Sequence, residues 1–157
     1  MKSIEEAIQQ KKFRSVYQKA VINLIYTANW LQNKHQSFFK AYGITGQQFN
    51  ILRVLRGQHP ERISATEIKC RMLDQNSDVS RLLDRLEAKG LIVRRTCERD
   101  KRAADVFISQ RGMELLRELD KKEKEIERLL ALTEQEATAL SDLLDKARAI
   151  SDSPADH

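Results

Sequence analysis

The hydrophobic pattern changes abruptly at Gly90, and this change constrains the fold more than any other feature of the sequence. Before Gly90, the apolar residues of "NSDVSRLLDRLEAKG" recur at spacings of three and four, which predicts an amphipathic helix capped by Asp74 or Asn76 and ending at Lys89. After Gly90, the stretches "LIVRR" and "VFIS" have the alternation of half-buried strands. Glycine readily adopts the left-handed backbone that ends a helix, so a helix stops and a strand starts around this one residue.

The predicted helix has an apolar stripe and a polar outer face. The stripe consists of Val79, Leu82, Leu83 and Leu86. At about 100° per residue, the outer side carries short hydrogen-bonding side chains and guanidinium groups, namely Asn76, Ser77, Ser80, Arg81 and Arg85. Such side chains recognise base edges and phosphates when a helix enters a major groove. A solvated surface helix has the same pattern, so the helix alone leaves both interpretations open.

The segment before this helix favours DNA binding. Ser64-Ala-Thr-Glu67 matches a capping box and opens a short helix, "SATEIKCRML", which "DQN" separates from the next helix. Two helices joined by such a turn, the second with a polar outer face, form the helix-turn-helix arrangement.

The charged stretch between the two predicted strands extends this pattern. Residues 94–102 contain five basic and two acidic side chains. Two strands after a helix-turn-helix form a winged helix, whose tip reaches phosphates and the adjacent minor groove. The wing residues that we expect at DNA are Arg95, Arg99, Asp100, Lys101 and Arg102. The alternative interpretation is a hairpin tip that is charged only to stay solvated.

Helices account for most of the remaining chain, in which glycine and proline are rare. Capping boxes start at Thr45, Ser64 and Thr133, and Ser109 is a further cap. The helices expected besides the one before Gly90 cover residues 11–39, 47–56, 65–72, 110 to about 131, and 134–149. The predicted fold class is therefore mostly α with a small β-hairpin wing.

Composition limits the classes of function. A chain of 157 residues fits one domain, and its charge is uneven: +7 in residues 1–56, +2 in 57–105 and −4 in 106–157. The chain has no run of about 18 apolar residues and no signal-peptide core, so we expect a cytoplasmic protein without a membrane partner. No zinc-site spacing, glycine-rich phosphate loop or motif joining Ser, His and Asp is present. We therefore expect no metal, no cofactor, no catalytic residue and no enzyme.

The chain has two cysteines, too few for a disulfide framework. Cys97 lies between Arg95 and Arg99, where positive charge favours the thiolate. Cys70 lies in the first helix of the helix-turn-helix pair and is expected to be buried.

Three stretches resemble the multiple antibiotic resistance regulator (MarR) family of bacterial transcription factors: "QFNILRVLRG", "TEIKCRMLDQNSDVSRLLDRLEAKGLIVRR" and "DKRAADVFISQRG". The resemblance extends over about residues 13–149, and its most specific part is Asp100-x-Arg102 followed by "VFIS" and Gly112. It implies a winged-helix homodimer on pseudo-palindromic DNA, with its first and last helices at the dimer interface. It also implies that Arg102 enters the minor groove while Asp100 holds it in place. Many members are repressors released by small phenolic ligands or by cysteine oxidation.

Two apolar stripes near the C-terminus lie outside the winged helix and need a cover. They consist of Ile126, Leu129, Leu130 and Leu132, and of Ala137, Leu140, Leu143, Leu144 and Ala147. The stripes can fold back on their own core, but the resemblance favours a homodimer. We expect residues 1–157 to form one MarR-type unit. Its winged helix-turn-helix lobe covers 45–109, and the helices of its dimerisation region cover 10–42 and 110–150.

Aromatic residues near the first two long helices form a candidate cleft for a small aromatic effector. They are Trp30, His35, Phe38, Tyr42 and Phe49. Aromatic residues at helical spacing also form ordinary core, so this interpretation competes with plain packing.

The resulting hypothesis is a ligand-responsive repressor that binds double-stranded DNA as a homodimer. The alternative is a helical protein–protein adaptor with a solvated basic hairpin.

Overall fold

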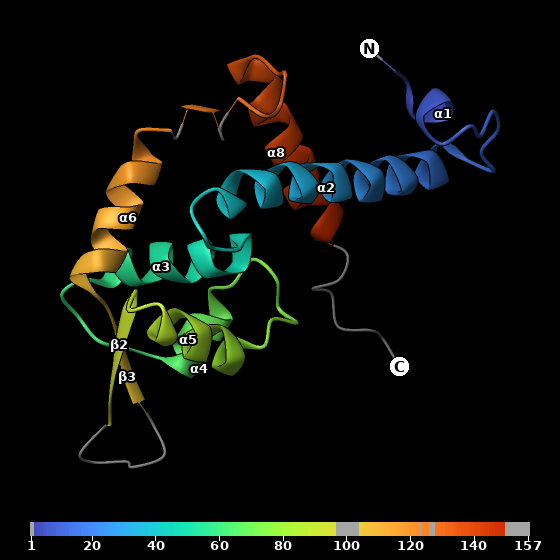
Figure 1. The fold of residues 1–157 in the computed structure, drawn as a ribbon. Coiled ribbons are helices and arrows are strands. Elements are labelled where there is room, and N and C mark those ends of the chain that lie inside the picture. Colours follow the sequence, from blue (N-terminus) through green and yellow to red (C-terminus); the bar gives the residue numbers. More distant parts are fainter. Residues whose placement is uncertain (1, 97–103, 123, 126–127, 150–157) are drawn as a thin grey trace, which may run out of the picture. The chain divides into compact units, whose positions relative to one another are not determined.

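The computed structural model describes residues 2–96, 104–122, 124–125 and 128–149. They fall into two compact units, Met1–Lys122 and Glu123–His157. The first unit contains, in chain order, α1 (Ile4–Ala7), α2 (Val16–Lys40), α3 (Gly46–Gln58), β1 (Ile63–Ser64), α4 (Ala65–Cys70), α5 (Val79–Ala88), β2 (Ile92–Thr96), β3 (Ala104–Ile108) and α6 (Gln110–Asp120) (Figure 1). The second contains α8 (Glu134–Arg148). The predicted fold class, mostly helical with a small hairpin, is confirmed.

The sheet has three antiparallel strands in the order β1-β3-β2. Val93 lies opposite Phe107 in the hairpin, and Ile63 of β1 pairs with Val106 on the other edge of β3. The sequence analysis did not predict β1, because a two-residue strand is too short to show alternation. Within the described residues, no helix is both long and apolar enough to span a membrane.

Helix α3 is the centre of the first unit. It contacts α2, α5, α6 and β3, and Figure 1 shows it crossing between α2 and the α4–α5 pair. The side chains in the core are almost inaccessible to solvent, among them Ile51, Leu52, Ile68, Leu83, Leu86, Val106 and Leu116. At the surface, Arg56 of α3 donates to both carboxylate oxygens of Asp120 in α6, at 3.0 and 2.7 Å. Helix α5, the candidate second helix of the helix-turn-helix pair, therefore packs on α3, which also contacts α2, α6 and β3.

Local signals located the starts of α3, α4, α6 and α8. The capping boxes at Thr45, Ser64 and Thr133 are all formed, and Ser109 accepts from the backbone N–H of Gly112 at 3.0 Å. Gly90 has a φ of +69°, as its role as a helix stop requires. A further box at Ser3 starts α1, a short helix that the sequence analysis did not predict.

Three helix bounds differ most from those expected. Helix α2 starts at Val16 because Ser15 caps it by accepting from the N–H of Gln18 at 3.1 Å. Helix α6 ends at Asp120, and the next five residues up to Glu125 are all charged, so no apolar side chain supports its continuation.

The third difference concerns α5, whose cap is Asp78 and not Asp74 or Asn76. The carboxylate of Asp78 accepts from the N–H of Arg81 at 3.1 Å. Asp74 is engaged otherwise, because its carboxylate accepts from the N–H of Asn76 at 2.9 Å and holds the chain in a turn.

Gly112, which interrupts the box pattern after Ser109, lies where α6 meets the sheet. A Cβ atom there would lie 2.3 Å from the carbonyl oxygen of Leu91 and 2.8 Å from Cγ1 of Ile108. The hydroxyl of Ser109 donates to the carbonyl of Gly90 at 2.6 Å and secures the same junction. Only glycine allows this close approach.

We predict that Gly112→Ala lowers the free energy of unfolding by about 1–3 kcal/mol, the usual cost of overpacking a buried site. Gly57→Ala is the control, because nothing lies within 4 Å of an added Cβ in that position of α3. The control should be neutral or stabilise by up to about 1 kcal/mol through helix propensity. Urea denaturation measures both, and equal stability of the two variants would contradict the close approach at Gly112.

Candidate nucleic-acid interface

The outer face of α5 is polar and accessible. Ser80, Arg81 and Arg85 are exposed, and the side chain of Arg81 is 72% accessible. Arg81 lies only loosely near its cap, with Nε 3.9 Å from the carboxylate of Asp78. Asn76 is also exposed, but it lies in the turn before the helix. Four of the five predicted recognition residues are therefore available to a ligand.

The fifth, Ser77, is not, and its predicted outward position is wrong. Ser77 is 5% exposed, and its hydroxyl accepts from Nε2 of Gln47 at 3.3 Å. The helical projection does not apply to it because the helix begins only at Val79. Nε2 of Gln47 also donates to the carboxylate of Asp74 at 3.0 Å. The first turn of α3 thus holds the turn that precedes α5.

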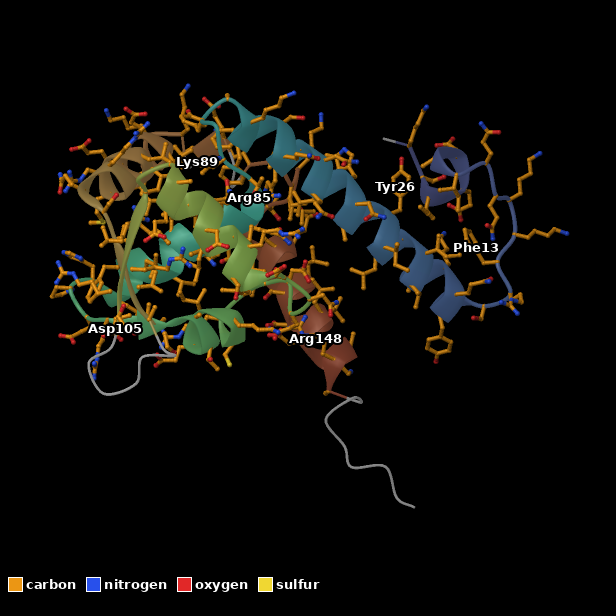
Figure 2. All side chains as sticks on the ribbon, turned by 60° about the horizontal axis from the view of Figure 1, so that its bottom comes forward. Phe13, Tyr26, Arg85, Lys89, Asp105 and Arg148 are labelled. Atoms are coloured by element: carbon orange, nitrogen blue, oxygen red, sulfur yellow. The ribbon has the colours of Figure 1, made fainter. Side chains whose placement is uncertain are left out.

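The other end of α5 is attached to the same part of α3. Nζ of Lys89 donates to the carbonyl of Gly43 and, at 3.2 Å, to Oε1 of the buried Gln48. Figure 2 shows Lys89 at the end of α5, beyond Arg85. The sequence analysis identified Gln48 only as a capping-box residue, and a long-range partner leaves no local signal.

The root of the hairpin is linked to α5 through Arg94. Its Nε donates to Oε2 of Glu87 at 2.9 Å, and its Nη2 lies 2.8 Å from Oδ1 of Asp84. The hydrogen bond from Arg94 lowers the pKa of the Glu87 carboxyl below its usual range, and the same bond raises the pKa of Arg94. Arg94 was counted among the basic residues of the hairpin, but its charge is directed to α5.

Arg95 lies on the opposite face of β2 and is exposed. Its guanidinium carbon is 5.4 Å from the ring centroid of Phe107, within the range of a cation–π contact. Across the sheet, Arg62 pairs with Asp105 at 3.4 Å. The other predicted wing residues, Arg99, Asp100, Lys101 and Arg102, lie outside the described residues, as does Cys97.

The predicted effector cleft is only partly assembled. Phe39 contacts three of the predicted cleft residues: it stacks on Phe49 with centroids 4.6 Å apart and makes edge contacts with Phe38 and His35. Phe38 in turn contacts Tyr42. Burial lowers the pKa of His35. Trp30 is separate, because it lines a small pocket with Lys2 and Tyr26.

A larger cavity of about 610 Å³ lies between the turn after α2, the C-terminal end of α5, and α6. Of the predicted cleft residues, only Tyr42 lines it, together with Lys89, Arg111 and Glu114 among others.

Several large apolar side chains are exposed on the two longest helices. On α2 they are Val16, Tyr17, Val21, Leu24, Ile25, Tyr26 and Trp30, and on α8 they are Leu140 and Leu143. Helix α8 has no buried residue at all. These faces have the character of surfaces that a partner covers.

Cys70 is exposed, so its predicted burial is wrong. The buried anchor of α4 is Ile68, and a residue two positions further along a helix lies on the far side. Among the described residues, no three His, Cys, Asp or Glu side chains gather as metal ligands would.

Known proteins are similar to this chain in sequence and in fold. A sequence model described as the MarR family matches residues 42–103. The chain is 32% identical over 89 residues to the transcriptional repressor MprA of Escherichia coli (strain K12). The matched residues make up 57% of this chain and 50% of MprA. The match thus spans about half the length of this curated relative.

Two solved structures are similar over most of the chain. A MarR transcription factor from Planctomyces limnophilus is 26% identical, with a TM-score of 0.65 over 90% of this chain and 100% of that chain. The MepR–DNA complex of S. aureus is 23% identical, with a TM-score of 0.70 over 87% of this chain and 97% of that chain. At this identity, the second likeness shows the fold alone.

Two helices joined by a turn and followed by a hairpin in a small sheet define a winged helix-turn-helix protein. The chain belongs to the MarR family, which confirms the resemblance noted in its sequence. Members of this family are transcription regulators, in agreement with the expectation that the chain is not an enzyme.

We predict that Ser77→Ala lowers the free energy of unfolding by about 1 kcal/mol, the typical net value of a hydrogen bond. Ser80→Ala is the matched control, because Ser80 is exposed and its loss should change stability by less than about 0.5 kcal/mol. A double-mutant cycle tests the contact between the two side chains. Urea denaturation gives the stability of Ser77→Ala, of Gln47→Ala and of the variant that carries both substitutions. Additive effects of Gln47→Ala and Ser77→Ala would mean that the two side chains do not interact.

Proposed function

We propose that the protein is a transcriptional regulator, specifically a ligand-responsive repressor that binds a pseudo-palindromic operator as a homodimer. One observation carries this proposal: the exposed Ser80 and Arg81 lie on a helix held at both ends by α3 and next to a hairpin that leads into the basic stretch 94–102. The names of the relatives support it, since MprA is a repressor and MepR was solved with DNA. The domain limits expected from the sequence, with a lobe over 45–109, remain part of the proposal.

In this proposal, α5 enters the major groove with its N-terminal half. Arg81 and Arg85 contact bases or phosphates, while Ser80 and Asn76 hydrogen bond to base edges. Ser77 no longer belongs to the set, because its hydroxyl is engaged by Gln47. It supports the turn from behind.

The wing has a separate role. Arg95, Arg99 and Lys101 follow phosphates, and Arg102 enters the minor groove, oriented by Asp100. The narrow minor groove of A/T-rich DNA attracts a guanidinium because its negative potential is enhanced. Among these wing residues, Arg95 lies within the described part of the chain. Its contact with the ring of Phe107 orients its guanidinium.

The homodimer part of the proposal rests on the apolar faces of α2 and α8. Leu143 is 64% and Tyr17 is 80% exposed, values that are unfavourable for large apolar side chains unless they are covered. A second copy of the chain supplies the cover that each face lacks, and it brings two copies of α5 to one DNA duplex.

The effector part concerns the cavity beside Tyr42. Its volume of about 610 Å³ lies in the range of small-molecule sites. Tyr42 supplies a ring for a small aromatic effector, and the cations Lys89 and Arg111 share the lining with Glu114 and Glu118, so the lining has charged groups of both signs for polar substituents. Lys89 also holds the C-terminal end of α5, so a molecule bound there has a route to the DNA-reading helix.

We predict that the protein binds DNA upstream of its own gene with an affinity that falls steeply as salt is added. A plot of the logarithm of the binding constant against the logarithm of the salt concentration should have a slope of about −0.9 for each phosphate that the protein neutralises. Arg81→Ala should reduce the preference for that DNA over unrelated DNA by roughly 1–3 kcal/mol, because a base contact is lost. Fluorescence anisotropy with both DNAs over a range of salt measures these quantities.

The control is Arg117→Ala, which removes the same charge from an exposed position in the last turn of α6. It should leave the preference unchanged. Equal weakening of both DNAs by Arg81→Ala would make Arg81 a phosphate contact. Failure of the wild-type protein to bind any DNA would favour the adaptor interpretation.

We predict that Leu143→Glu converts the dimer to monomers without unfolding them, because Leu143 is exposed in the single chain and a charge is costly only in a covered interface. Ser141→Glu adds the same charge to an exposed position of α8 and should leave the dimer intact. Sedimentation equilibrium gives the mass, and circular dichroism reports folding. A Leu143→Glu dimer would place the interface elsewhere.

A further inference from the structure

The side chains of helix α5 include carboxylates, which are unfavourable on a helix that approaches DNA. Between Val79 and Ala88 it carries Arg81 and Arg85, but also Asp84 and Glu87, so its own side chains have no net charge. Asp84 is 65% and Glu87 40% exposed. Carboxylates at such positions repel phosphates unless a cation neutralises them.

Arg94 of β2 neutralises both. Its Nη2 lies 2.8 Å from Oδ1 of Asp84 and 2.5 Å from Oε2 of Glu87, and its Nε donates to the same oxygen of Glu87 at 2.9 Å. The Arg94 side chain is 29% exposed, less than either carboxylate. One guanidinium therefore spans two carboxylates from the side of the strand.

The fold brings these residues together because the chain reverses at Gly90. The left-handed backbone there, with φ +69°, ends α5 and turns β2 back along it. Position 94 then lies beside positions 84 and 87, with its side chain on the α5 side of the strand. Arginine suits this position because its planar fork has several donors in fixed directions, which the single ammonium of lysine lacks.

Stability alone does not account for the arrangement. Ion pairs of this exposure contribute little to folding. The hydrogen bond from Arg94 keeps the pKa of Glu87 below its usual range. A glutamate is ionised at neutral pH even at its usual pKa, so Glu87 carries its charge there with or without Arg94. The arrangement affects instead the charge that α5 presents and the angle at which the hairpin leaves it.

We propose that Arg94 is a positioning residue for DNA binding, which acts by neutralising Asp84 and Glu87 and fixing the root of the hairpin against α5. This inference rests on the proposed function. Arg94 acts through the two carboxylates, in contrast to Arg95 on the other face of β2, which is free of them and contacts DNA itself.

The test is a rescue experiment in the full-length protein, with binding measured on the upstream DNA at one fixed salt concentration. Arg94→Gln leaves the two carboxylates without their cation and should weaken binding roughly tenfold, within the range of coupling between charged neighbours. Adding Asp84→Asn and Glu87→Gln to Arg94→Gln removes the repulsion and should restore most of the affinity. Arg94→Lys keeps the charge without the fork and should lose less than Arg94→Gln.

Arg95→Gln provides the matched control, alone and with the same two substitutions, Asp84→Asn and Glu87→Gln. Arg95→Gln should lower the affinity by the same factor in the wild-type protein and in a protein that already carries Asp84→Asn and Glu87→Gln. The reason is that Arg95 does not neutralise the two carboxylates. Thermal unfolding of each variant checks that the fold is kept.

Two results would overturn the inference while leaving the proposed function intact. If the triple variant binds no better than Arg94→Gln, then Arg94 is itself a DNA contact. If Arg94→Gln binds like the wild-type protein, the carboxylates do not matter. No binding by the wild-type protein overturns both the inference and the proposed function.

Discussion

The close approach of two backbone segments at Leu91 and Gly112 is the constraint on which the rest of the first unit depends. The carbonyl of Leu91 accepts from the N–H of Ser109 at 3.0 Å, and its oxygen occupies the space that a side chain at position 112 would need. The N–H of Leu91 in turn donates to the carbonyl of Leu86 at 3.0 Å. The end of α5, the roots of both hairpin strands and the start of α6 therefore meet at a single residue.

Two kinds of interaction then position α5, and they act on different degrees of freedom. Burial of Val79, Leu82, Leu83 and Leu86 contributes roughly 1.5–3 kcal/mol for each side chain and fixes how deeply the helix is seated. A hydrogen bond contributes only about 0.5–1.5 kcal/mol. The polar links from Gln47 and Lys89 are thus minor in energy, but they are directional and hold the two ends of the helix. Packing secures the helix, and the polar links set its orientation.

The sequence was sufficient for several structures that depend on neighbours in the chain, although the local caps at Ser3 and Asp78 were missed. The stop at Gly90 and the box at Ser64 involve residues a few positions apart, so their patterns are visible in the sequence. Ser77 was misplaced because its environment depends on Gln47, 30 residues away, and because the true cap is Asp78. The role of Gly112 was likewise hidden, since only the folded chain brings Leu91 next to it.

The basic hairpin shows the same limit in terms of charge. Counting residues 94–102 gives five cations, but the charge of Arg94 is directed to Asp84 and Glu87. The hairpin therefore offers less positive charge to a polyanion than its sequence suggests, and α5 offers more. Positive potential is shared between the outer face of the helix, at Arg81 and Arg85, and the strand face of Arg95. In the proposed function, the helix face reads the major groove and the hairpin lies along the adjacent groove, so the division of charge between them suits a contact that spans both.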